Sequence, residues 1–162
     1  MKLITIALCL ILLPLNNETI TTEHLKVFEG EWTGTLSYLN YADDKKMVDL
    51  TLKMEATFDG KSLKFDYFYN EGNGRIEKRN GNFKLKGDQV IFNGKWKKEK
   101  AYIQGLDQWQ LFLSSEGKDN NRPALFKKHV EVSPNEIVVT KMVKYLDADG
   151  DYFLRNKHVF KR

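Results

Sequence analysis

The sequence predicts an all-β protein: a single up-and-down antiparallel barrel of eight to ten strands with one short N-terminal helix. Three observations support this prediction. The 162 residues suffice for one ordinary domain, apolar and polar residues alternate along most of the chain, and Asp-Gly or Asn-Gly pairs recur between the alternating segments. Alternation is the period of a strand with one buried face, and these pairs suit tight hairpin turns.

The composition excludes several classes of protein. Apolar residues make up 41% of the chain and charged residues 30%, which is too apolar for a disordered chain and too charged for a polytopic membrane protein. The 26 Lys and Arg exceed the 22 Asp and Glu by only four. The lysine-rich stretch 95–100 contains Trp96, but acids are mixed throughout the chain and favour a solvated edge. We therefore expect no nucleic-acid partner.

Residues 1–22 form the expected leader. An apolar run from Leu3 to Leu15 follows a positive start, which matches a secretory signal and is too short to span a bilayer. The sequence thus predicts an exported protein (periplasmic, cell-envelope or secreted) without an integral membrane span. No cleavage site is evident, so a retained anchor or a buried N-terminal segment stays open. The single cysteine, Cys9, lies in this run, so a processed chain would contain no thiol.

Residues 23–162 form the expected barrel domain. The segment 21–29 is the helical candidate, with Thr22 placed to cap it and Gly30 placed to end it. The clearest strand runs from Val48 to Phe58, where the alternation is strict. Later strands are expected at residues 63–69, 89–92, 96–103, 108–115, 124–132, 136–146 and 152–161. Turns are expected at Asp59-Gly60, residues 70–74, Asn80-Gly81, Gly87-Asp88 and Asn93-Gly94.

Consecutive hairpins that each have one apolar face must bring these faces together. Closure into a barrel buries the faces and removes the two free edges of the sheet. A sandwich of two sheets is the alternative arrangement. Barrels of eight to ten strands are wide enough to enclose a small ligand cavity.

A Gly-x-Trp motif, Gly30 and Trp32, follows the short helix and opens the first strand. The motif resembles the signature of lipocalins and related fatty-acid-binding (calycin) barrels, and the resemblance covers about residues 23–162. It implies that Trp32 plugs the closed end of the barrel and that a basic residue of the last strand, here Arg162, lies across its ring. The segment 32–41 is also similar to uncharacterised exported lipocalin-like proteins of Bacteroidetes-type bacteria. The chain lacks the disulfide pair and the clear C-terminal helix of typical lipocalins.

Aromatic and polar side chains that share the inward parity are the candidate ligand-binding residues: Tyr38, Phe65, Tyr67, Tyr69, Trp109 and His158. An apolar pocket edged by hydroxyls and amides suits a small hydrophobic or amphiphilic ligand. Asn156 and Lys141 are further inward polar candidates, and Lys141 could pair with a ligand carboxylate unless its strand faces the other way. The alternative is that the rings fill the barrel, which would then act through its surface as an interaction or structural module.

His158 shares the apolar face of the last strand with Leu154 and Phe160, whereas His24 and His129 are expected to be solvated. An inward imidazole could ligate haem iron or act as an acid–base group in an enzymatic barrel. Ten-stranded haem barrels of the nitrobindin type are similar in outline and use one late histidine. The simpler interpretation is a half-buried, hydrogen-bonded histidine.

Enzyme signatures are missing from the sequence. There is no Gly-x-Ser-x-Gly, no phosphate-binding glycine loop and no His-Glu-x-x-His motif. In an EF-hand loop that began at Asp147, the sixth and twelfth positions, which need glycine and glutamate, would hold Tyr152 and His158, so the acidic run 147–151 is interpreted as a turn. We expect no catalysis and no metal site. The sequence favours an exported, monomeric binding protein for a small molecule.

Overall fold

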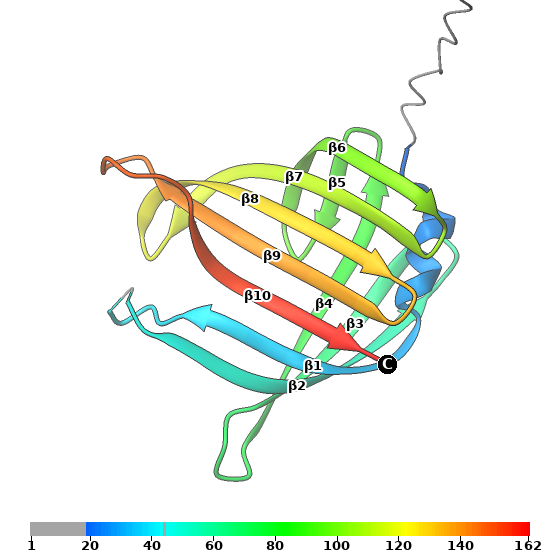
Figure 1. The fold of residues 1–162 in the computed structure, drawn as a ribbon, viewed down its shortest axis with the longest axis horizontal. Helices are drawn as coiled ribbons and strands as arrows, with labels where there is room; N and C mark the ends of the chain where they lie inside the picture. Colours follow the sequence, from blue (N-terminus) through cyan, green and yellow to red (C-terminus); the bar gives the residue numbers. More distant parts are fainter. Residues whose placement is uncertain (1–18, 44) are drawn as a thin grey trace, which may run out of the picture.

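Ten antiparallel strands close into a barrel in the computed structural model, which describes residues 19–43 and 45–162 (Figure 1). Each strand pairs with its neighbours in sequence, and the first strand pairs with the last to complete the circle. The up-and-down barrel is therefore confirmed, and the sandwich alternative is wrong. Most of the expected leader, residues 1–18, lies outside the described residues.

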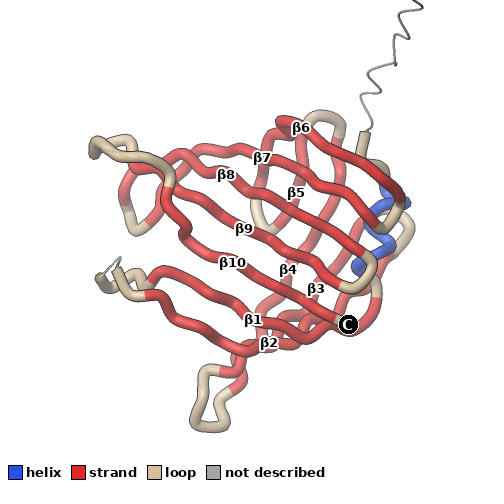
Figure 2. Tube along the Cα trace, in the orientation of Figure 1, coloured by secondary structure: helices blue, strands red, loops and turns tan. Residues whose placement is uncertain are grey.

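Strands dominate the described part of the chain, and the short helix precedes all of them (Figure 2). The elements are η1 (Thr22–Phe28), β1 (Gly30–Leu39), β2 (Met47–Phe58), β3 (Ser62–Asn70), β4 (Ile76–Lys86), β5 (Gln89–Phe92), β6 (Lys95–Gly105), β7 (Gln108–Asp119), β8 (Arg122–Ser133), β9 (Glu136–Tyr145) and β10 (Phe153–Lys161). Within the described part of the chain, no helix has the length and apolar character needed to cross a membrane.

The helix η1 is a 3-10 helix whose N-cap is Thr21 rather than Thr22. The backbone N–H of Thr21 donates a hydrogen bond to Nδ1 of His24 over 3.2 Å. His24 is only 8% exposed, so its expected solvation is wrong. His129 is half-buried on β8, where its ring stacks on Phe112 with the centroids 4.2 Å apart.

The turn expected at Asn80-Gly81 is also wrong, because β4 runs through both residues. Gly81 pairs with Phe65 of β3. A Cβ at position 81 would lie 2.2 Å from Oδ1 of Asn93 and 2.9 Å from the Tyr67 ring. The glycine therefore allows a close approach of these two side chains inside a strand, instead of supplying a turn.

The base of the barrel is packed with aromatic rings under η1. Phe28 contacts Phe65 and Phe83 at centroid distances of 5.9 Å and Trp109 at 6.0 Å. The indole N–H of Trp32 donates to the carbonyl of Phe28 over 2.8 Å. These contacts close one end of the barrel.

Arg162, which follows β10, packs against this closed end of the barrel. Its guanidinium lies 4.0 Å from the centroid of the Trp32 ring, the contact that the resemblance to calycin barrels implies. Its Nη2 also donates to the carbonyl of Val27 over 3.0 Å and to the carbonyl of Glu29. The C-terminus is thereby tied to both η1 and β1.

A bulge in β10 changes which of its residues face inward. Leu154 pairs with Met142, and Asn156 pairs with Lys141, so Arg155 is the extra residue on this strand. Arg155 is fully buried, and Leu154 shares the outward register of Met142. The expected inward position of Leu154 is therefore wrong, whereas His158 and Phe160 keep the inward parity.

We expect Arg162→Ala to lower the free energy of unfolding by about 1–3 kcal/mol, because it removes a cation–π contact and hydrogen bonds to two helix-end carbonyls. The measurement is urea unfolding. Lys161→Ala is the control, since Lys161 forms only an exposed ion pair with Glu136 at 3.3 Å and should change stability by less than about 0.5 kcal/mol. Equal effects of the two variants would contradict a structural role for Arg162.

Candidate functional site

Two adjoining cavities lie in the interior of the barrel. The outer cavity has a volume of about 390 Å³, and the inner cavity has a volume of about 230 Å³. Asn156 and His158 line both, so the cavities meet at these two residues of β10. The two cavities therefore adjoin inside the barrel.

The predicted lining residues divide between these cavities and the packed base. Tyr38 and Tyr69 line the outer cavity, Tyr67 lines the inner one, and His158 lines both. The remaining two, Phe65 and Trp109, belong to the rings around Phe28 and line neither of these cavities.

Aromatic rings form one wall of this space. Tyr67 stacks against Tyr69 with centroids 6.1 Å apart, and His158 stacks on Phe160 at 5.7 Å. Tyr67 also lies 6.3 Å from His158, which connects the two pairs. The rings gather here because alternation on β3 and β10 directs every second side chain inward, and closure brings the two faces together.

His158 is a neutral imidazole at neutral pH. Burial lowers its pKa to about 4, and the positive charge of Lys128 contributes to the shift. Its Nε2 lies 3.4 Å from the hydroxyl of Tyr69. A haem iron would need this nitrogen to face an open slot, but the nitrogen faces a hydroxyl and the ring is stacked on Phe160. Because His158 also lines both cavities, ligation of haem iron would require the Tyr69 hydroxyl to move away from Nε2, and it stays a prediction.

Lys128 is a buried cation that sequence reasoning missed. The residue is 7% exposed, and its Nζ donates to the carbonyl of Phe92 over 2.7 Å. The same Nζ lies 4.4 Å from the Phe92 ring and 4.1 Å from the Trp96 ring. Among residues 19–43 and 45–162, no carboxylate forms an ion pair with it. Burial lowers the pKa of Lys128 to about 7, and the charge of Lys141 contributes.

Lys141 lines the same inner cavity from β9. It lies on the buried side of this strand with Val139 and Val143, which settles the orientation that the sequence left open. Its Nζ lies 4.4 Å from the Phe126 ring and 3.7 Å from a carboxylate oxygen of Asp119. Burial lowers the pKa of Lys141, and Asp119 opposes this shift.

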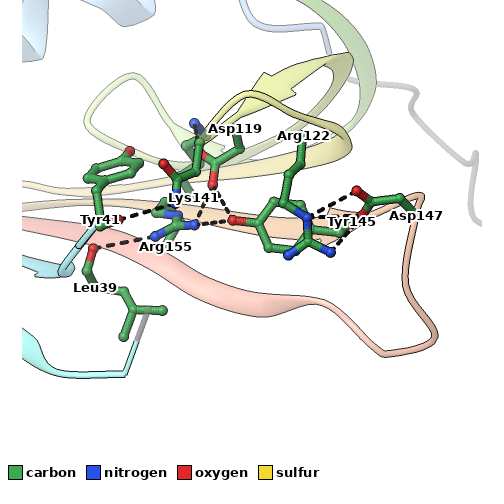
Figure 3. A network of polar contacts seen from close by, with 9 residues as sticks. Leu39, Tyr41, Asp119, Arg122, Lys141, Tyr145, Asp147 and Arg155 are labelled. Carbon is green, nitrogen blue, oxygen red and sulfur yellow. Dashed lines mark hydrogen bonds and ion pairs between the residues drawn. The ribbon is translucent and has the colours of Figure 1, made fainter. Parts of the chain in front are cut away.

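A polar network at the mouth of the barrel holds Asp119 in place (Figure 3). Arg155 donates to the Asp119 carboxylate, and it also donates to the hydroxyl of Tyr145 over 2.7 Å. The Tyr145 hydroxyl in turn donates to Asp119 over 3.1 Å, and Arg155 reaches the carbonyl of Leu39 at 3.4 Å. Side chains from β7, β9 and β10 are thereby joined to the end of β1.

The outer cavity carries charges of both signs. Glu77 and Arg79 of β4 line it, and the guanidinium donates to the carboxylate over 2.7 Å. This contact lowers the pKa of Glu77, so that the pair stays ionised at neutral pH. The inner cavity differs, because its lining includes two lysines and no carboxylate. In the described parts of the chain, no three His, Cys, Asp or Glu side chains gather to hold a metal ion.

The alternation pattern could have identified two of the three buried charged residues that the sequence analysis did not name. Lys128 shares the parity of Phe126 and Val130, which are buried on the same strand. Asp119 extends the inward parity of Leu113 to the end of β7. Arg155 has no such signal, because a bulge and not the alternation buries it.

No family model matches this chain, and no curated protein sequence matches it. Among solved structures, the crystal structure of Rv2717c from M. tuberculosis superposes with a TM-score of 0.62 and 13% sequence identity. The match covers 85% of this chain and 94% of that chain. The likeness shows a calycin-like barrel fold, and it assigns neither a named family nor a ligand.

We expect Asp119→Asn to lower the free energy of unfolding by about 3 kcal/mol, because the variant removes the carboxylate that neutralises the buried Arg155. Asp147→Asn is the matched control, since Asp147 pairs with Arg122 at the surface and should cost much less stability. Chemical denaturation of both variants measures the difference. If Asp119→Asn lowered the free energy of unfolding as little as Asp147→Asn does, the network would not stabilise the mouth of the barrel.

Lys128→Met should be more stable than the wild type at acidic pH. The folded-state pKa of Lys128 is about 7, below its ordinary 10.5, so the unfolded chain binds the extra proton between these values. The wild type therefore gains stability as pH rises above about 7, and the cost of the buried charge is fully present below it. We expect a difference of a few kcal/mol at pH 6 that shrinks toward pH 10.

Denaturant unfolding of both proteins across this pH range measures the effect. Lys127→Met is the control, because Lys127 is the exposed neighbour of Lys128 on the same strand. If wild type and Lys128→Met show the same pH dependence, the burial of Lys128 carries no such cost.

Proposed function

We propose that this protein binds a small amphiphilic molecule inside its barrel, without catalysing a reaction. The inner cavity carries the proposal, because it combines aromatic walls with two inward lysines and no carboxylate on its lining. An apolar body would lie against the rings of Tyr67 and Phe160. A polar, electron-rich end would meet Lys128 and Lys141.

The arrangement of polar groups supports an amphiphilic ligand over a purely apolar one. Buried cations and amides are costly when they have no partner. Asn156 and His158 lie where the two cavities meet, so a ligand that extends from one cavity to the other would pass both side chains. The calycin-like fold is consistent with this use of the interior.

We also propose that the protein is exported and monomeric. Export is indicated by residues 1–22, most of which lie outside the described residues, and follows from their pattern of a positive start and an apolar run.

Octanol, octanoate and octylamine test the proposal, because they share one tail and differ in the charge of the head group. We expect octanol and octanoate to bind, and octylamine to bind at least about tenfold more weakly, since its ammonium group would face two lysines. Isothermal titration calorimetry at pH 7 measures the three dissociation constants. Failure of all three compounds to bind would refute the proposal.

A matched pair of variants locates the site. Val139 lines the inner cavity, and its neighbour Val138 has the opposite parity on the same strand. Val139→Phe should fill part of the cavity and weaken octanol binding by about tenfold or more, whereas Val138→Phe should leave it unchanged. Equal binding to both variants would place the ligand elsewhere.

A further inference from the structure

The amine of Lys128 is placed for chemistry as well as for binding. Its side chain lines the inner cavity, its Nζ lies 4.1 Å from the Trp96 ring, and it forms no ion pair within the described residues. Lys141 adds a second positive charge to the same cavity. A lysine in an apolar pocket beside another cation is the arrangement that makes an amine nucleophilic at neutral pH.

We propose that Lys128 captures small apolar aldehydes as a reversible imine within the inner cavity. This inference rests on the proposed function, because the aldehyde must first enter the barrel as an amphiphilic ligand does. It goes further by naming a carbonyl as the polar end of the ligand and one amine as its covalent partner.

The reaction needs no oxidant or reductant. The lone pair of the Lys128 nitrogen attacks the carbonyl carbon, a C–N bond forms, and the π bond of the carbonyl breaks to give a carbinolamine. The carbonyl oxygen then leaves as water with two protons, both of which come from the original amine. The product is a neutral imine, and addition of water to it returns the aldehyde and the free amine.

The side chains around Lys128 favour both the binding of the aldehyde and the attack on its carbonyl carbon. The charge of Lys141 can stabilise the negative charge that develops on the carbonyl oxygen during attack. The aromatic rings that line the cavity give the alkyl chain of the aldehyde an apolar surface to pack against. In the free amine, Nζ donates one N–H to the carbonyl of Phe92, and its lone pair remains available for the attack.

The titratable groups that face Lys128 across the cavity are Lys141 of β9, His158 of β10 and Tyr67 of β3. Burial keeps His158 neutral by lowering its pKa to about 4, and burial raises the pKa of Tyr67, so the tyrosine also stays neutral. Burial lowers the pKa of Lys128 to about 7, which leaves a large fraction as free amine at neutral pH. For an exposed lysine, with an ordinary pKa near 10.4, the fraction of free amine at neutral pH is roughly a thousandfold smaller.

The test is incubation of the full chain with substoichiometric octanal at pH 7, followed by borohydride reduction and peptide mapping by mass spectrometry. We expect an octyl group on Lys128 of the wild type, formed at least about 100-fold faster than on any exposed lysine. Lys127→Met should be labelled at Lys128 as the wild type is. Lys128→Met should lose this label. Peptide mapping separates the adduct from one at the N-terminal amine, which also titrates near neutral pH.

Competition by octanol gives a second readout that does not depend on a variant. Saturating octanol should protect Lys128 from octanal and leave exposed lysines unaffected. If octanal labels only exposed lysines or the N-terminus while octanol still binds, the inference is overturned and the proposed function stands. If neither octanol nor octanal enters the barrel, both fail.

Discussion

The pairing of β1 with β10 is the constraint on which the rest of the structure depends, because it turns a series of hairpins into a barrel with an interior. The two strands lie so close that a Cβ at Gly34 would be 2.0 Å from the carbonyl oxygen of Val159. Arg162 holds the same junction at the base, against the ring of Trp32. If β1 and β10 were separated, His158 would lie on an edge strand and the aromatic wall would be open to water.

The buried charged side chains of the interior differ in whether a partner of opposite charge neutralises them. This difference points to function. At the mouth, Arg155 is neutralised by Asp119 and receives further support from Tyr145. Lys141 lies between the two regions, since it lines the inner cavity and approaches Asp119. Lys128 has rings and one carbonyl around its ammonium group but no carboxylate. A folded chain retains such a costly group most readily where a ligand or a reaction uses it.

Much of the fold and part of the site could be predicted because alternation is a local property. The period of two identified nearly every strand, and it placed Tyr38, Tyr67 and His158 on inward faces that the structure shows as cavity lining. Prediction failed where one local sequence pattern was compatible with two structures. Gly81 resembles a turn residue, but it is a glycine because Asn93 approaches its backbone.

The sequence by itself determined the all-β class, the hairpin order and the face on which most side chains lie, since each of these follows from neighbours in the chain. Only the tertiary structure decided which side chains meet across the barrel. The bulge at Arg155, the ion pair of that residue with Asp119 and the isolation of Lys128 from any carboxylate of the described residues all depend on strand register and closure. Register joins residues far apart in sequence, and the pattern along one strand does not contain that information.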